Sequence, residues 1–135
     1  MSGVDCSRPD LGNPGVGGTQ YCFLLLIYYI LRFDPKSYRV RVYCSSDCFF
    51  PQGVEKVLVE DIFEGLTESK RRGDDFIIIK DNKDQQLARF IDKLRHRIVI
   101  WGHNFYFGDY ADWVAKSPSV IANVFVGRQQ YDRYI

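Results

Sequence analysis

The sequence has almost no net charge, few histidines and no long hydrophobic run. Its 135 residues contain 18 lysines and arginines against 17 aspartates and glutamates, so no field of one sign draws the chain to nucleic acid or anionic lipid. The longest apolar stretch, residues 21–31, is closed by Arg32 and is much shorter than the ~20 residues that a membrane span needs. We therefore expect no nucleic-acid partner and no membrane span.

Targeting and metal-binding patterns are equally scarce. The first residues lack the basic flank and apolar core of a signal peptide, which predicts a cytoplasmic protein. The four cysteines form no repeated Cys-x-x-Cys pair and have no histidine cluster nearby, so we expect reduced structural thiols and neither a metal nor a cofactor. His96 lies in a basic turn and is expected to be solvated. No Ser-His-Asp order or carboxylate pair indicates self-contained hydrolytic chemistry.

A glycine-rich stretch precedes the most apolar segment of the sequence. Residues 11–19 combine glycines with a proline and predict a tight loop. Residues 20–33 carry almost no helix breaker and are apolar around the whole helix axis, which predicts a helix covered on most sides. Asp34 and Pro35 end it.

The remaining sequence alternates strand patterns with helical ones. We expect strands over 38–44, 76–79, 98–101 and 120–126, a weaker strand or short helix over 54–59, helices over 82–94 and 109–116, a solvated basic turn at 70–72, and another helix from 128. This alternation predicts an α/β fold, a Rossmann-like three-layer sandwich with a mostly parallel sheet, in one domain over 1–135.

The first candidate site is the glycine loop, residues 15–19, at the start of the long helix. The first amides of a helix and its positive dipole end suit a phosphate or another anion, which makes Gly17, Gly18 and Thr19 candidate ligands. The alternative is that the glycines only allow a tight connection and Thr19 caps the helix. The loop is not a Walker A motif, and its spacing departs from the dinucleotide-binding fingerprint, which disfavours NAD.

Two further candidates follow strands, where ligands bind in open parallel sheets. His103 and Asn104 come directly after the strand at 98–101, and His103 can donate to a sugar hydroxyl, hold a phosphate or transfer a proton. The alternative is a histidine satisfied by neighbouring backbone groups. Arg128 follows the last strand and either faces a cleft or is simply an exposed arginine at a helix start.

Three segments together resemble one known family. Residues 13–21, 99–104 and 124–130 are similar to the N-terminal domain of retaining glycosyltransferases of the GT-B fold, and the resemblance covers nearly the whole chain. It implies half of a two-domain enzyme, with a UDP- or GDP-hexose donor held mainly by the C-terminal domain and a carbohydrate acceptor mainly by this one. It places Gly17 and Gly18 near the donor phosphate and acceptor, and His103 near the donor sugar, as the catalytic candidate.

The sequence departs from this family at both ends. The C-terminal donor domain does not follow Ile135, so we expect a truncated form or fragment that is inactive alone. The hydrophobic first strand of the family is missing or vestigial, which predicts marginal stability, rearrangement or self-association through the exposed sheet edge or the missing-domain interface. The alternative function is a non-catalytic binding or assembly module; a Rossmann-type domain for some other phosphorylated ligand rests on fold analogy alone.

Overall fold

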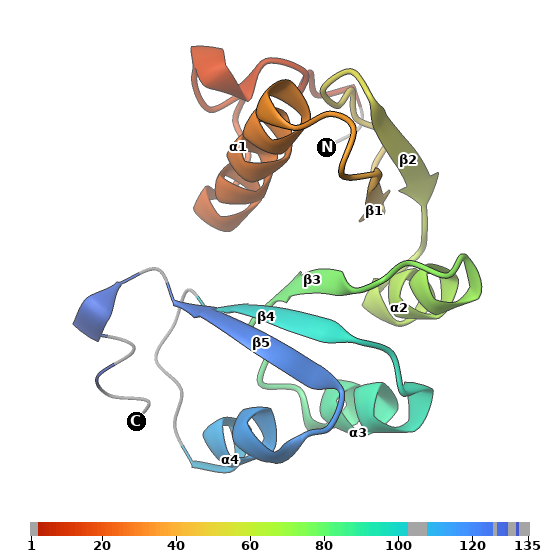
Figure 1. The fold of residues 1–135 in the computed structure, drawn as a ribbon, viewed down its shortest axis with the longest axis vertical. Coiled ribbons are helices and arrows are strands. Elements are labelled where there is room, and N and C mark those ends of the chain that lie inside the picture. Colours follow the sequence, from red (N-terminus) through yellow and green to blue (C-terminus); the bar gives the residue numbers. More distant parts are fainter. Residues whose placement is uncertain (1–2, 103–107, 126, 130–131, 133–135) are drawn as a thin grey trace. The chain divides into compact units, whose positions relative to one another are not determined.

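The structure is a computed structural model that describes residues 3–102, 108–125, 127–129 and 132. Strands and helices alternate from Val54 to Phe125, and every strand ladder in the described residues is parallel (Figure 1). This arrangement confirms the predicted α/β, Rossmann-like class. The strands form two small sheets, and the chain divides into two compact units, Met1–Gly65 and Leu66–Ile135. The single domain over 1–135 stays a prediction.

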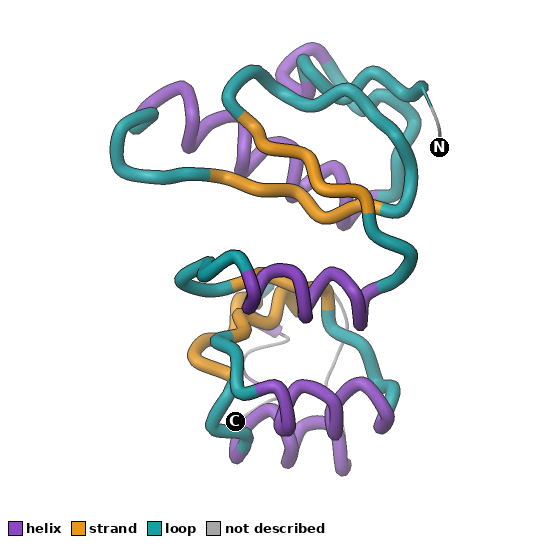
Figure 2. The backbone as a smooth tube through the Cα atoms, turned by 90° about the vertical axis from the view of Figure 1, so that its right-hand side faces the viewer, coloured by secondary structure: helices purple, strands orange, loops and turns teal. Residues whose placement is uncertain are grey.

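The first unit is built from one long helix and a two-stranded sheet. Its elements are the 3-10 helix η1 (Pro9–Leu11), α1 (Gly18–Phe33), β1 (Val40–Cys44) and β2 (Val54–Leu58). The two strands pair in parallel, from Val40 opposite Val54 to Cys44 opposite Leu58, so the segment predicted as strand or helix is a strand. Figure 2 shows α1 running along one face of this sheet.

A short extended segment near the start of the chain pairs with a later loop. Asp5 forms an isolated parallel bridge with Phe49. The Phe49 amide donates to the Val4 carbonyl at 3.0 Å, and the Cys6 amide donates to the Phe49 carbonyl at 2.7 Å. The segment before the glycine loop therefore pairs with the loop after β1, although it is too short to count as a strand.

The expected coverage of α1 on most sides was wrong. Thr19 and Leu24 are its buried residues, whereas Phe33 is 75% exposed and its ring stacks on the exposed ring of Tyr29. A two-stranded sheet is too narrow to cover a helix that is apolar around its whole circumference. None of the helices in the described residues is long and apolar enough to cross a membrane.

The second unit is a three-stranded parallel sheet with helical connections. Its elements are β3 (Ile77–Lys80), α3 (Gln85–Leu94), β4 (Ile98–Gly102), α4 (Gly108–Lys116) and β5 (Val120–Phe125). The strand order is β3-β4-β5, and α3 and α4 lie side by side on one face (Figures 1 and 2). The predicted strands and helices of this region are confirmed. Leu87 and Ile91 of α3 are buried together with Ile98 and Ile100 of β4.

One carboxylate joins α3 to the end of α4. Asp92 accepts hydrogen bonds from Trp113 Nε1 at 3.0 Å and from Ser117 Oγ at 2.6 Å. At the other end of α3, Asp84 is the N-cap and accepts from the Gln86 amide at 2.8 Å. These contacts fix the helix against which the sheet packs.

The structure contains a helix, α2 (Ile62–Arg71), that was not predicted from the sequence. The predicted solvated turn at 70–72 was wrong, because two of those residues lie in the last turn of α2. Asp61 Oδ1 accepts from the Glu64 amide at 2.9 Å at the start of the helix, and Glu68 pairs with Arg71 at 2.7 Å near its end. Local capping and ion pairing stabilise a helix whose overall composition is polar.

We expect Gly65→Ala to raise the free energy of unfolding by about 0.5–1 kcal/mol, because alanine is the better helix former. A methyl group at this position in α2 would lie 3.5 Å from the Tyr43 side chain and 3.7 Å from that of Val59, which is ordinary contact. Urea unfolding of the variant beside the parent measures the difference. A loss of stability would mean that the site cannot accept the methyl group.

Candidate functional site

The path of the glycine loop is set by the side chain of Asn13. Its Oδ1 accepts from the amides of Gly15 and Val16, each at 2.9 Å, and its Nδ2 donates to the Val16 carbonyl at 2.9 Å. Gly15 has φ +102°, a conformation that favours glycine. The tight turn of the loop therefore depends on Asn13 and Gly15.

Helix α1 begins directly after this turn, with Gly17 as its N-cap residue. The Tyr21 amide donates to the Gly17 carbonyl at 2.9 Å, which is the first bond of the helix. Thr19 lies inside the helix, buried in its first turn, and no side chain caps the helix start, so the alternative in which Thr19 caps the helix is wrong. Because Gly17 has no side chain, the cap residue supplies no acceptor to the first amides, and the positive end of the helix dipole lies at the loop.

Neither Gly17 nor Gly18 is required by the backbone conformation. Both lie outside the positive-φ region, and a Cβ built on Gly18 would have no heavy atom within 4 Å. A Cβ on Gly17 would meet only the end of the flexible Gln20 side chain. Glycine is common at the N-cap, the position of Gly17, whereas packing and conformation give no reason for a glycine at position 18.

A small core lies beneath the loop. Val16 from the loop and Leu24 from α1 are buried together with Cys6 and Cys48. Tyr21 packs against this cluster, and its hydroxyl donates to the Pro9 carbonyl at 2.9 Å. The glycine loop is thus held from below by the N-terminal segment and by the loop after β1.

The other predicted site residues lie in the second unit or outside the described residues. His103 and Asn104 belong to the part of the chain that the structure does not describe. Arg128 is exposed, and its Nε pairs with Asp132 Oδ1 at 3.1 Å. Gly17, Gly18 and Thr19 are brought together at one helix start, and their predicted roles, like those of His103, Asn104 and Arg128, stay predictions.

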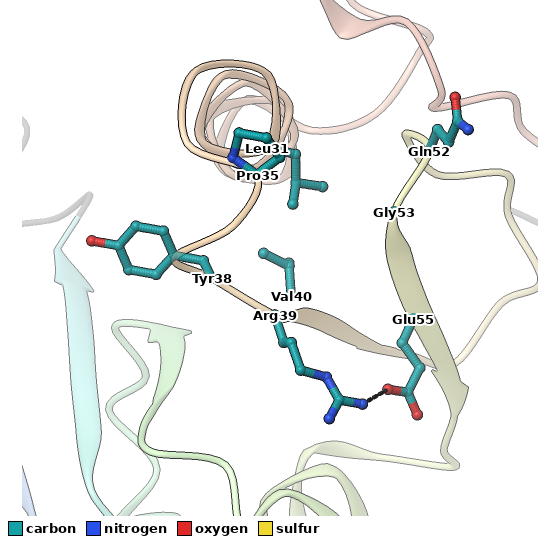
Figure 3. Close-up of a pocket in the computed structure, with 8 residues that line it drawn as sticks. All are labelled: Leu31, Pro35, Tyr38, Arg39, Val40, Gln52, Gly53 and Glu55. Carbon is teal, nitrogen blue, oxygen red and sulfur yellow. Dashed lines mark ion pairs between the residues drawn. The ribbon is translucent and has the colours of Figure 1, made fainter.

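The first unit also has a cavity of about 330 Å³ that was not predicted from the sequence. In Figure 3, Leu31 of α1 and Val40 of β1 extend into the hollow, and Arg39 and Glu55 form an ion pair at its edge at 3.8 Å. The cavity lies where β1 and β2 begin. Ligands were expected at the opposite, carboxyl ends of the strands. No local sequence pattern marks it, because its wall comes from three separate segments.

The expected solvation of His96 was also wrong. His96 is buried, and its Nε2 lies 2.9 Å from Ser69 Oγ, which donates at 2.8 Å to Asp74 Oδ2. Since Ser69 has one proton and gives it to the carboxylate, it accepts from His96 Nε2–H. Burial lowers the pKa of His96, the positive charges of Lys70 and Arg97 act in the same direction, and Asp74 opposes them. This arrangement leaves Ser69 no role as a nucleophile.

The described residues contain no group of histidines, cysteines and carboxylates that could hold a metal ion. No protein-family model, curated protein or solved structure matches the chain. Functional assignment therefore rests on the residues of the site.

Proposed function

We propose that this chain is the N-terminal, acceptor-side domain of a retaining glycosyltransferase, an enzyme that transfers a hexose from a nucleotide sugar to a carbohydrate acceptor. The parallel α/β arrangement supports this proposal, as does a glycine-rich loop that opens a long helix. In this proposal the glycine loop approaches the donor phosphate and the acceptor, and His103 approaches the donor sugar. Charge on the leaving diphosphate is neutralised by residues of the C-terminal domain.

The observation that carries the proposal is Gly18. This residue begins α1 with space around its Cα that the fold does not fill. A glycine in a helix costs up to about 1 kcal/mol relative to alanine, so its presence without a conformational need points to a group that approaches the backbone. The amides of the first turn suit an anionic group in that space.

The second candidate is a non-catalytic binding or assembly module, favoured by the apolar surface of α1. The stacked rings of Tyr29 and Phe33 are exposed near the end of this helix, and Leu11 in η1 is exposed as well. Apolar side chains that stay exposed in an isolated unit favour contact with another protein surface. This candidate predicts self-association or a protein partner and no response to nucleotide sugars.

We expect Gly18→Ala to weaken binding of UDP, GDP and their hexose conjugates at least about tenfold, a loss of ~1.4 kcal/mol. The added methyl group would occupy the space that the phosphate uses. Because that space is empty in the fold, the free energy of unfolding should stay the same or rise by up to about 1 kcal/mol. Ligand-detected NMR or isothermal titration measures the binding, and urea unfolding measures the stability.

Two further variants separate the interpretations. Gly65→Ala is the matched control, because it also adds one methyl group to a helix but lies away from the glycine loop, and it should leave binding unchanged. His103→Ala should weaken binding of the hexose conjugates more than binding of the free nucleotides. If neither UDP, GDP nor any conjugate binds the parent chain, the glycosyltransferase proposal loses its support and the assembly module becomes the better interpretation.

A further inference from the structure

Two cysteines are buried beneath the glycine loop. Cys6, in the N-terminal segment, is 2% exposed, and Cys48, in the loop after β1, is 5% exposed. They share one core cluster with Val16 and Leu24. Their sequence separation is large, so only the fold brings these thiols together.

The backbone pairing places both thiols on the same side. Asp5 is opposite Phe49 in the parallel bridge, and side chains alternate between the two faces of paired extended segments. Cys6 follows Asp5 and Cys48 precedes Phe49, so both side chains lie on the face opposite to that pair, in agreement with their membership of the core cluster that also contains Leu24 of α1. The Cys48 thiol is close enough to contribute to the raised pKa of Cys6.

The surroundings of the pair affect its reactivity. Burial raises the pKa of the Cys6 thiol, and the Cys48 and Asp5 charges raise it further. Burial likewise raises the pKa of Cys44, with the positive charge of Lys56 acting against that change. Because the thiolate is the reactive form, the Cys6 thiol should exchange slowly near neutral pH and faster as the pH rises.

We propose that Cys6 and Cys48 form a reversible disulfide that ties the N-terminal segment to the loop after β1. The oxidant is a small-molecule disulfide such as oxidised glutathione. One cysteine loses its proton, attacks the glutathione disulfide and releases one glutathione thiolate. The second cysteine, also deprotonated, attacks the protein sulfur of the mixed disulfide and releases the other glutathione thiolate. The protein loses two electrons and two protons, and glutathione disulfide is reduced to two thiols.

The crosslink would act on the base of the glycine loop. Val16 of that loop packs against the same cluster, and the bridge between Asp5 and Phe49 has no continuous ladder to hold it. A disulfide between residues far apart in the chain removes disorder from the unfolded state and holds the two segments together. Oxidation therefore holds together the two segments that pack against the glycine loop, and reduction lets them separate.

The test is oxidation of the folded chain by excess oxidised glutathione, followed by thiol counting and peptide mapping by mass spectrometry. The number of free thiols should fall from four to two, with the loss of the mass of two hydrogen atoms and a crosslinked peptide pair containing Cys6 and Cys48. Hydrogen exchange of the Cys6 and Phe49 amides should slow on oxidation, and dithiothreitol should reverse both changes.

Variants distinguish this pair from the other two cysteines. The double variant Cys22→Ala and Cys44→Ala should oxidise like the parent, whereas Cys6→Ala should keep its remaining thiols free of any intramolecular bond. Mapping of the parent chain decides the matter if Cys6→Ala does not fold. A pair formed by Cys44 with Cys48, a stable mixed disulfide with glutathione, or four thiols that stay free would each overturn the proposal.

Discussion

Replacing Ile100 by alanine is expected to lower the free energy of unfolding of the second unit by about 2–5 kcal/mol. Ile100 lies in β4, the central strand of the three-stranded sheet, and is only 1% exposed. Truncation removes buried methyl and methylene groups and leaves a cavity that the paired strands cannot close. The two tryptophans of the sequence, Trp101 and Trp113, both lie in this unit, so tryptophan fluorescence in urea follows its unfolding selectively.

The matched control is Ile121→Ala on the neighbouring strand β5. Ile121 is 50% exposed, so the same chemical change should cost less than about 1 kcal/mol. Equal losses in the two variants would mean that β4 does not lie at the centre of a packed core. An unchanged midpoint for Ile100→Ala would contradict the fold of this unit.

Acid is expected to destabilise the second unit as the pH falls below about 6.5, the ordinary pKa of an unfolded-chain histidine, before most carboxylates take up protons. The pKa of His96 is lowered in the folded chain by burial, so the unfolded chain binds a proton that the folded chain does not. Stability is therefore fully present above the unfolded pKa of about 6.5 and is lost as the pH falls toward the folded pKa. A single group produces at most about 1.4 kcal/mol of change for each pH unit.

Urea unfolding followed by tryptophan fluorescence at several pH values measures this dependence. His96→Gln should flatten the curve in that window, although it also disturbs the hydrogen bond to Ser69 and lowers stability at neutral pH. His103→Gln is the control, because it removes the only other histidine of the sequence. If stability still depends on pH in His96→Gln but no longer does in His103→Gln, His103 and not His96 causes the pH dependence, and the prediction is wrong.

The strands of the second unit could be predicted because local sequence determines them. The apolar runs at Ile77–Lys80 and Ile98–Gly102 have few alternatives to a buried strand. Helix α2 was missed because polar residues obscure its apolar positions, and its stability comes from capping by Asp61 and ion pairing by Glu68. Composition is a poor guide where side-chain contacts within one or two turns determine the structure.

The site could be predicted only where neighbouring residues define it. The glycines predict the loop at the start of α1. Only the backbone φ angles show that Gly15 adopts a conformation that favours glycine, whereas Gly18 does not. The buried side chain of His96 contacts Ser69, which is 27 residues earlier in the chain, and no local sequence pattern predicts that contact. The cavity beside Leu31 has the same origin, since its walls come from segments that only folding brings together.

The role of Asn13 has a consequence for how this chain can change over evolutionary time. One asparagine side chain holds the turn of the glycine loop through three hydrogen bonds, while the two residues that open α1 contribute little to its path. In the proposed function, the shape of the loop and the recognition of a ligand therefore depend on different positions. If the proposed function holds, substitutions at 17 and 18 change which ligand approaches the helix while Asn13 preserves the turn, and ligand preference can then change without a new fold.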